Sequence, residues 1–173
     1  MIFNSLVFIV TFPIIIMLYY IMPEKVKNIF LFLISLGFYA CFKFTYVFLL
    51  LAVIGVAYAS TLVMVGKEQN YKKKILIVDV VLAVGMLAVF KYSNVLPIGV
   101  SFYTFVALGY VIDVYRGRIE SEKNIIAFGT FVSFFPPLLS GPIERAENLL
   151  KQIKAKKEFN EERILNGVCR MLW

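Results

Sequence analysis

The stretch FTYVFLLLAVIGVAYASTLVMVG, residues 44–66, decides the fold of this 173-residue chain. It contains no charged residue, and it is long enough to cross a bilayer, because a transmembrane helix needs about 20 mainly apolar residues. Gly55 and Ala59 stand four positions apart on it, a spacing of small residues that favours close helix packing. We therefore predict a membrane-spanning helix over this stretch.

Five more apolar runs accompany this stretch. Together they predict an all-α protein, a polytopic transmembrane helix bundle with about five or six membrane segments over residues 1–142. The runs at 29–42 and 75–90 are short for a full crossing, so tilted, half-membrane or re-entrant segments are the alternatives there. The six runs cover residues 2–22, 29–42, 44–66, 75–90, 98–115 and 125–140.

Composition favours a membrane protein over a soluble domain. Hydrophobic residues make up 61% of the chain and charged residues 17%, whereas soluble domains are about half apolar and a quarter charged. The net charge of +7 favours the anionic headgroups of a lipid bilayer as its partner. The basic residues lie between apolar runs and form no stripe with exposed aromatic residues, so no nucleic-acid partner is expected.

The residue types exclude several kinds of chemistry. The chain has no histidine, the commonest general base and metal ligand, and its cysteines, Cys41 and Cys169, have no metal-site spacing. Motifs of nucleophile elbows, phosphate loops and zinc proteases do not occur. We therefore predict no catalytic residue, no metal site and no bound cofactor within these 173 residues.

The chain changes character after Pro142. Residues 143–159 place Ala146, Leu149, Leu150 and Ile153 on one helical face with lysines beside it, which predicts an amphipathic helix. That helix lies either on a membrane surface or against the bundle. Residues 160–173 keep a helical period with no capping signal, and we interpret them as the start of a further, truncated helix in a longer protein.

Orientation is ambiguous from the sequence. Residues 67–74 and 145–163 are the most basic loops, and the positive-inside rule places both in the cytoplasm. Three apolar runs separate them, so strict alternation would place them on opposite sides. We expect one of the three not to be a simple span, and the run at 75–90 is the first candidate because it is short and contains Asp79.

Two carboxylates lie inside apolar runs, where charge is costly. Asp79 follows Lys74 by five residues, so we interpret it as a solvated acid at headgroup level. Asp113 and Arg116 are three residues apart and share a helix face, which predicts an ion pair at the helix end. Contact of this pair with a substrate or partner is the alternative.

Two polar, proline-containing stretches differ from a lipid-facing pattern. LPIGVSFYTF, residues 96–105, gathers the hydroxyls of Ser101, Tyr103 and Thr104, which serve either as interhelical hydrogen bonds or as a cavity lining. FFPPLLSGPIER, residues 134–145, contains prolines that remove backbone donors. Freed backbone at membrane depth is tolerated only within protein or beside a water-filled cavity, so a polar cavity bordered by both stretches is predicted.

These stretches also resemble a known family. LPIGVSFYTF and ALGYVIDVYRG, followed by FVSFFPPLLSGPIER, resemble the membrane-bound O-acyltransferases, and the opening elements FNS, FP, YY and SLGFY resemble the branch of bacterial alginate and peptidoglycan O-acetyltransferases. The match covers essentially the whole chain but about a third of a family member. The candidate motif and tunnel residues are Pro97, Gly99, Ser101, Tyr103, Tyr110, Asp113, Arg116, Pro136, Ser140, Gly141, Pro142 and Arg145.

The resemblance implies a helical bundle around a tunnel in a bacterial cytoplasmic membrane. Family members transfer an acyl group from a cytoplasmic donor, acetyl-CoA or an acyl carrier, to a hydroxyl of an extracytoplasmic polymer. Their signature histidine has no counterpart here, so we expect this chain alone to be inactive. The implied partners are the remaining part of the enzyme, a separate acetyltransferase and an envelope polysaccharide.

Three alternatives remain at this point. Within the family, a teichoic-acid D-alanyl transfer protein shares the same motifs. A non-catalytic membrane scaffold subunit fits the missing histidine. A transporter would be favoured by an inverted repeat between two halves, and none is visible in the sequence.

Overall fold

The computed structural model describes residues 6–41, 43–92, 99–134 and 145–155, and within these ranges it contains helices and no strand. The predicted all-α class is therefore confirmed for the described residues. The helices are α1 (Leu6–Ile21), α2 (Glu24–Ala40), α3 (Phe44–Met64), α4 (Gln69–Tyr92), α5 (Val100–Tyr115), α6 (Ile125–Ser133) and α8 (Ala146–Lys154).

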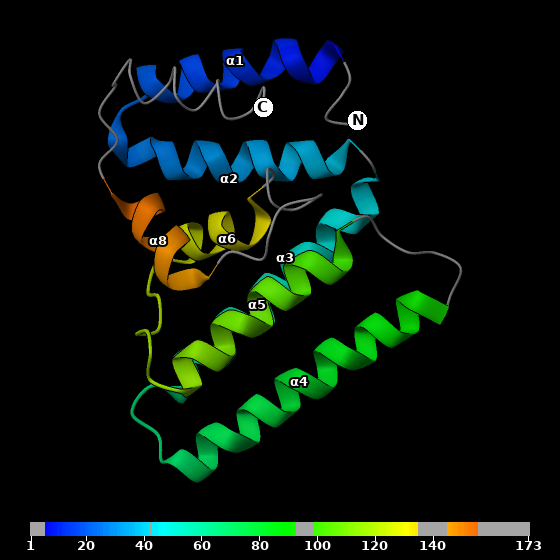
Figure 1. Cartoon of the computed structure of the whole chain (residues 1–173), viewed down its shortest axis with the longest axis vertical. Helices are drawn as coiled ribbons and strands as arrows, with labels where there is room; N and C mark the ends of the chain where they lie inside the picture. The colour runs from blue at the N-terminus through cyan, green and yellow to red at the C-terminus, as the bar shows by residue number, and fades with distance from the viewer. Residues whose placement is uncertain (1–5, 42, 93–98, 135–144, 156–173) are drawn as a thin grey trace.

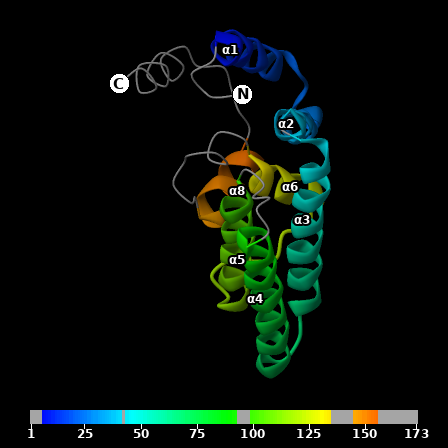
Figure 2. The same cartoon turned by 90° about the vertical axis from the view of Figure 1, so that its right-hand side faces the viewer.

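The helices form two neighbouring groups. In Figure 1, α1 and α2 lie side by side across the top, and α3, α4 and α5 slope together below them. The turned view of Figure 2 again shows α3, α4 and α5 running alongside one another. The short helix α6 packs mainly on α2 and also contacts α3, while α8 packs on α6 and α5. These two short helices therefore connect the two groups.

The helices α3 and α4 are the two described helices that are long and apolar enough to cross a membrane. α3 begins at Phe44, as the sequence predicts, and buries one side through Leu50, Ile54 and Met64. The run at 75–90, which was expected to be short for a full crossing, lies within a longer helix. Its helix has 24 residues, because the polar segment from Gln69 has good helix propensity and forms the first turns of α4.

The helix α6 is shorter than the apolar run that predicts it. The apolar run was expected to extend from 125 to 140, but the helix has nine residues and ends at Ser133, and residues 135–144 lie outside the described part. Nine residues rise about 14 Å, roughly half of a hydrocarbon core. The Asn124 side chain caps its start by accepting hydrogen bonds from the amides of Ile126 and Ala127, at 2.9 and 3.2 Å.

An aromatic cluster joins α5 to α6. The rings of Tyr110 and Phe128 have centroids 4.6 Å apart, and Phe131 lies 6.3 Å from Tyr110. All three side chains are at most 2% exposed. Gly129 lies against α2 so closely that an added Cβ would meet the ring of Phe32 at 2.8 Å. Close packing of α6 on its neighbours therefore depends on a residue without a side chain at this position.

The amphipathic segment forms α8, which is shorter than the predicted 143–159. Its buried residues Ala146, Leu150 and Ile153 belong to the predicted apolar stripe and pack against the bundle. This apolar face therefore packs on protein, which was one of the two placements considered for the helix. Residues 160–173, interpreted as the start of a further helix, lie outside the described residues.

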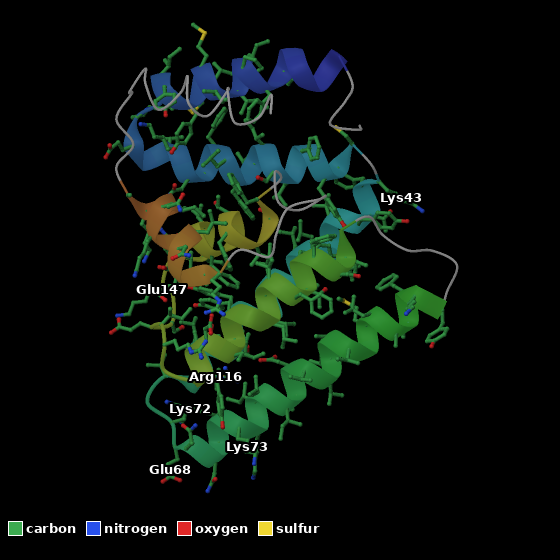
Figure 3. The ribbon with its side chains drawn as sticks, viewed as in Figure 1. Lys43, Glu68, Lys72, Lys73, Arg116 and Glu147 are labelled. Atoms are coloured by element: carbon green, nitrogen blue, oxygen red, sulfur yellow. The ribbon has the colours of Figure 1, made fainter. Side chains whose placement is uncertain are left out.

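Most described basic residues lie at one end of the molecule, because successive helices run in alternate directions. Figure 3 shows Lys72, Lys73 and Arg116 near this end and Lys43 at the opposite end. Lys91, in the last turn of α4, also lies at the end of Lys43. We call the first end the basic end. The connection from α3 to α4, the first turns of α4, the connection from α5 to α6 and the neighbouring α8 supply its described basic residues, which are Lys67, Lys72, Lys73, Lys74, Arg116, Arg118, Lys123, Arg145, Lys151 and Lys154.

Candidate functional site: a polar cleft at the basic end

The side chains of the motif at the start of α5 lie in different surroundings. Gly99 adopts a left-handed conformation, φ +77°, which favours glycine, and α5 begins at the next residue. Tyr103 is fully buried, and its ring meets that of Tyr39 on α2 edge to face, with centroids 6.0 Å apart. Thr104 is also buried but lines a cavity between α3, α4 and α5, while Ser101 is exposed. The three hydroxyls therefore do not line one common cavity.

A glycine turn at the end of α5 determines the partner of Asp113. Gly117 has φ +69°, its amide donates to the Val114 carbonyl, and the Arg118 amide donates to the Asp113 carbonyl. This pattern of hydrogen bonds ends a helix and reverses the chain. It brings Arg118 Nη1 to 3.6 Å from Asp113 Oδ1, while Arg116 stays exposed. The predicted Asp113–Arg116 pair is wrong, because the turn and not the helix face decides which arginine approaches the carboxylate.

The connection from α5 to α6 is held by the buried carboxylate of Glu122, which is 8% exposed. Its Oε1 accepts a hydrogen bond from the Asn124 amide at 3.0 Å, and its Oε2 lies 2.5 Å from the Lys154 ammonium on α8. The phenol oxygen of Tyr110 accepts a hydrogen bond from the Glu122 amide at 2.7 Å. One acidic residue thereby links α5, the cap of α6 and α8.

A polar cleft of about 240 Å³ lies beside this network, and we call it the arginine cleft. It is lined by Tyr110 and Asp113 of α5, by Arg118 of the glycine turn, and by Arg145 just before α8. A second cleft of about 280 Å³ adjoins it, shares Arg118, and extends to Glu122. Residues from the end of α5 and Arg145, far apart in sequence, therefore meet at the basic end.

The structure unites three of the predicted site residues, Tyr110, Asp113 and Arg145, in the arginine cleft. It places Gly99, Ser101 and Tyr103 near the opposite end of α5, and Arg116 outside the cleft lining. The remaining predicted residues lie outside the described part of the chain, and these are Pro97, Pro136, Ser140, Gly141 and Pro142.

Sequence reasoning missed three residues of this site: Arg118, Glu122 and Lys154. Gly117, which follows Arg116, was a signal that Arg118 would turn back toward α5, since a glycine just after a helix reverses the chain. Asn124 before an apolar run signalled the start of α6. The sequence held no signal that the polar connection at Glu122 would be covered by α8, because that contact depends on tertiary packing.

The arginine cleft is suited to holding an anionic group. The ion pair with Asp113 offsets the charge of Arg118, whereas Arg145 forms no ion pair within the described part of the chain. The cleft therefore keeps a positive charge, and guanidinium groups bind phosphate and carboxylate oxygens with fixed geometry. It contains no group with the ordinary properties of a general base at neutral pH, because histidine is missing from the whole chain.

A separate cavity contains Asp79, the other carboxylate within an apolar run. Asp79 was interpreted as a solvated acid near the headgroups, but its side chain is 7% exposed and lines the cavity between α3, α4 and α5. That interpretation is wrong, because the turns from Gln69 to Lys74 carry the helix onward and place Asp79 in the third turn, where α4 faces its neighbours.

Comparison with known proteins identifies relatives over nearly the whole chain. It is 34% identical to the probable alginate O-acetylase of Pseudomonas aeruginosa, over 99% of this chain and 38% of that protein. It is 33% identical to the corresponding protein of Azotobacter vinelandii, over 88% of this chain and 36% of that protein. The peptidoglycan O-acetyltransferase of Helicobacter pylori is 28% identical over 90% of this chain and 39% of its own length.

The chain thus spans well under half the length of these curated relatives. No protein-family profile matches the chain, and no solved structure matches it significantly. The relatives confirm the resemblance carried by the two motif stretches. The chain is a membrane protein homologous to the alginate and peptidoglycan O-acetylating enzymes, which are of the membrane-bound O-acyltransferase type.

Proposed function

We propose that the chain forms one part of an O-acyltransferase that moves acetyl groups onto hydroxyls of an envelope polysaccharide. The observation that carries this proposal is the homology to alginate O-acetylases over 99% of the chain. The names of the relatives include both alginate and peptidoglycan as acceptors, and the relatives with higher identity are the alginate enzymes. An alginate-like polysaccharide is therefore the favoured acceptor.

The proposed location is a bacterial cytoplasmic membrane, with the basic end in the cytoplasm. α1 to α5 alternate in direction, so each connection between them lies at the end opposite the previous one. The end that holds Lys72 and Arg118 is rich in basic residues, while the other end has Lys43 and Lys91 among the described ones. The positive-inside rule supports this orientation. The half-length helix α6 also supports it, because a helix that does not cross the membrane allows Arg145 to lie beside Arg118.

We assign the arginine cleft to the donor side of the reaction. Both proposed donors, acetyl-CoA and an acyl carrier, present phosphate groups, and the cleft offers Arg145 beside the Asp113–Arg118 pair. The role of these residues would be to hold the anionic part of the donor, not to transfer a proton. The base that activates the acceptor hydroxyl would come from a part of the enzyme beyond these 173 residues, because this chain has no histidine.

The proposed function is tested by reconstitution in a bacterium whose own alginate O-acetylase is deleted. The 173-residue chain is expressed alone, and then together with the part of the Pseudomonas aeruginosa relative that it does not match. We expect no acetyl ester on secreted alginate in the first case and measurable ester in the second. Ester formation by the chain alone would contradict the assignment of the base. Failure of the pair, with both parts shown to be folded in the membrane, would contradict the proposed function.

The cleft assignment has its own test in the reconstituted pair. Arg145→Gln removes a positive charge from the cleft, and we expect KM for the donor to rise about tenfold, as for the loss of one charge-assisted contact. Lys151→Gln is the matched control, since Lys151 forms an exposed pair with Glu147 and does not line the arginine cleft. Equal donor KM values for the two variants would exclude the donor role of Arg145.

A further inference from the structure

A cavity of about 220 Å³ lies between α3, α4 and α5, away from the arginine cleft. Its walls are almost entirely apolar, and the alanines Ala52, Ala57 and Ala83 make room for it on two of the helices. Asp79 from α4 and Thr104 from α5 are the two side chains in this lining that can form hydrogen bonds. The proposed acetyl transfer uses neither of them.

Both polar side chains are buried and lack a partner at one oxygen. Asp79 is 7% exposed and Thr104 is 2% exposed. The Oδ2 atom of Asp79 and the Oγ1 atom of Thr104 have no hydrogen-bond partner among the described residues. Buried polar atoms are almost always satisfied in native proteins, so each of these two atoms is available to a polar group that enters the cavity.

The two polar groups lie at opposite ends of the cavity. α4 and α5 run in opposite directions (Figure 1), and the lining extends from Asp79 to Met86 on one helix and from Thr104 to Val111 on the other. Seven residues of helix rise about 10 Å, which gives the length of the cavity. A ligand that fills it therefore needs an apolar body of that length with its polar group at the Asp79 end or at both ends.

The surroundings of the Asp79 carboxylate exclude several classes of ligand. Within the described part of the chain, no lysine or arginine forms an ion pair with it. An ionised carboxylate within a membrane is costly unless a positive charge or hydrogen-bond donors face it, and the Ser60 side chain on α3 provides one hydrogen-bond partner. A metal ion such as calcium would need about six or more oxygen ligands, which the apolar walls do not supply. A fatty acid or another anion would bring a second negative charge.

We propose that this cavity binds an alkyl chain that carries a protonated amine, with the ammonium group on Asp79 and the alkyl chain along the apolar walls toward Thr104. The size agrees with this, since an enclosed cavity of about 150 Å³ holds benzene, and the present cavity, which is partly open, measures about 220 Å³. Such an amine is carried either by a free single-chain amphiphile or by a lipid headgroup. The site does not depend on the proposed acyl transfer.

The test uses a primary amine on an eight-carbon chain with a mid-chain diazirine, and the matching alcohol as its neutral analogue. The purified 173-residue chain is reconstituted in phosphatidylcholine vesicles, photolabelled with each probe, and digested for mass spectrometry. We expect the amine to label residues 79–86 about tenfold more than the alcohol, as for one charge-assisted hydrogen bond. Equal labelling by the two probes would overturn the proposal.

Two variants connect the labelling to the cavity. Asp79→Asn keeps the shape of the side chain, and we expect it to reduce amine labelling to the level of the alcohol. Ala83→Leu keeps the carboxylate but fills the cavity, and it should reduce labelling by both probes. Glu120→Gln is the control, because this exposed carboxylate lies outside the cavity lining. Retention of the amine preference in Asp79→Asn, or undiminished labelling in Ala83→Leu, would each contradict the site.

Competition then distinguishes the two sources of the amine. Unlabelled n-octylamine is expected to displace the probe, whereas phosphatidylethanolamine added to the vesicles is not, because its phosphate would have to enter apolar walls. Displacement by both compounds would still support an ammonium site, and would assign the lipid headgroup as its source. Displacement by neither compound would overturn the proposal.

Discussion

Asp113 pairs with Arg118, five residues further along the chain, and not with Arg116 on its own helix face. The cause is Gly117, whose left-handed backbone turns the chain back over the last turn of α5. The same turn places Arg118 between the arginine cleft and its neighbour. A backbone conformation available mainly to glycine thus determines the charge pattern of the candidate site.

Gly117→Ala should disturb this arrangement. An alanine at φ +69° is strained by about 1 kcal/mol, and this strain lowers the free energy of unfolding by a similar amount. No atom of a neighbouring residue lies within 4 Å of the place that the new methyl group would take, so the effect comes from the backbone alone. Thermal unfolding in detergent measures it, with about 2–4 °C expected per kcal/mol. Gly55→Ala is the control, since it has the same free space within a helix and should not destabilise the protein.

The carboxylate of Glu122 supports a second prediction. Glu122→Ala removes the acceptor for the Asn124 amide and the partner of Lys154, and we expect a loss of about 1–3 kcal/mol in unfolding free energy. Glu122→Gln keeps an acceptor oxygen and should cost less, because Lys154 is half exposed and an exposed charge contributes little. Glu120→Ala is the control and should change stability by less than about 0.5 kcal/mol. An equal loss for Ala and Gln would show that the charge, and not the hydrogen bond, is what matters.

The contact between Gly129 and Phe32 gives a prediction whose sign depends on the background. In the native protein, Gly129→Ala should be destabilising, because the new methyl group would lie 2.8 Å from the Phe32 ring. In a Phe32→Ala background the same change should stabilise by up to about 1 kcal/mol, since alanine is the better helix former. A double-mutant cycle by thermal unfolding measures the difference. The same sign in both backgrounds would mean that the ring moves aside without cost.

The sequence predicts the helical class and α3 well, because a long uncharged run leaves few alternatives for residues 44–66. It is less successful where tertiary packing decides. Polar residues from Gln69 onward extended α4 beyond its apolar run, and α6 ended at Ser133, before the predicted limit. The orientation conflict rested on counting every apolar run as a full span, and the described part of the run at 125–140 contains a helix of nine residues.

For the candidate site, the sequence supplied residues but not their partners. Tyr110, Asp113 and Arg145 were singled out from two motif stretches, and only folding shows that they line one cleft. Glu122 lies in a polar connection whose pattern resembles an exposed loop, so its burial under α8 had no sequence signal. The burial of Asp79 was missed for a similar reason, since helix length and the neighbours of α4 decide it.

Orientation gives the last prediction, which tests the membrane topology directly. With Cys41 and Cys169 replaced by serine, single cysteines are placed at Asn70 and Lys151 on the basic end and at Lys43 on the opposite end, all exposed positions. In intact cells, an impermeant maleimide should label the cysteine at 43 and leave those at 70 and 151 unlabelled, because the basic end is expected in the cytoplasm. Permeabilised cells should allow labelling at all three positions, which controls for reactivity.

Labelling at 70 but not at 151 in intact cells would mean that α6 and the residues after it cross the membrane. Labelling at both 70 and 151 in intact cells, with none at 43, would reverse the orientation and remove the basis for placing the arginine cleft on the donor side.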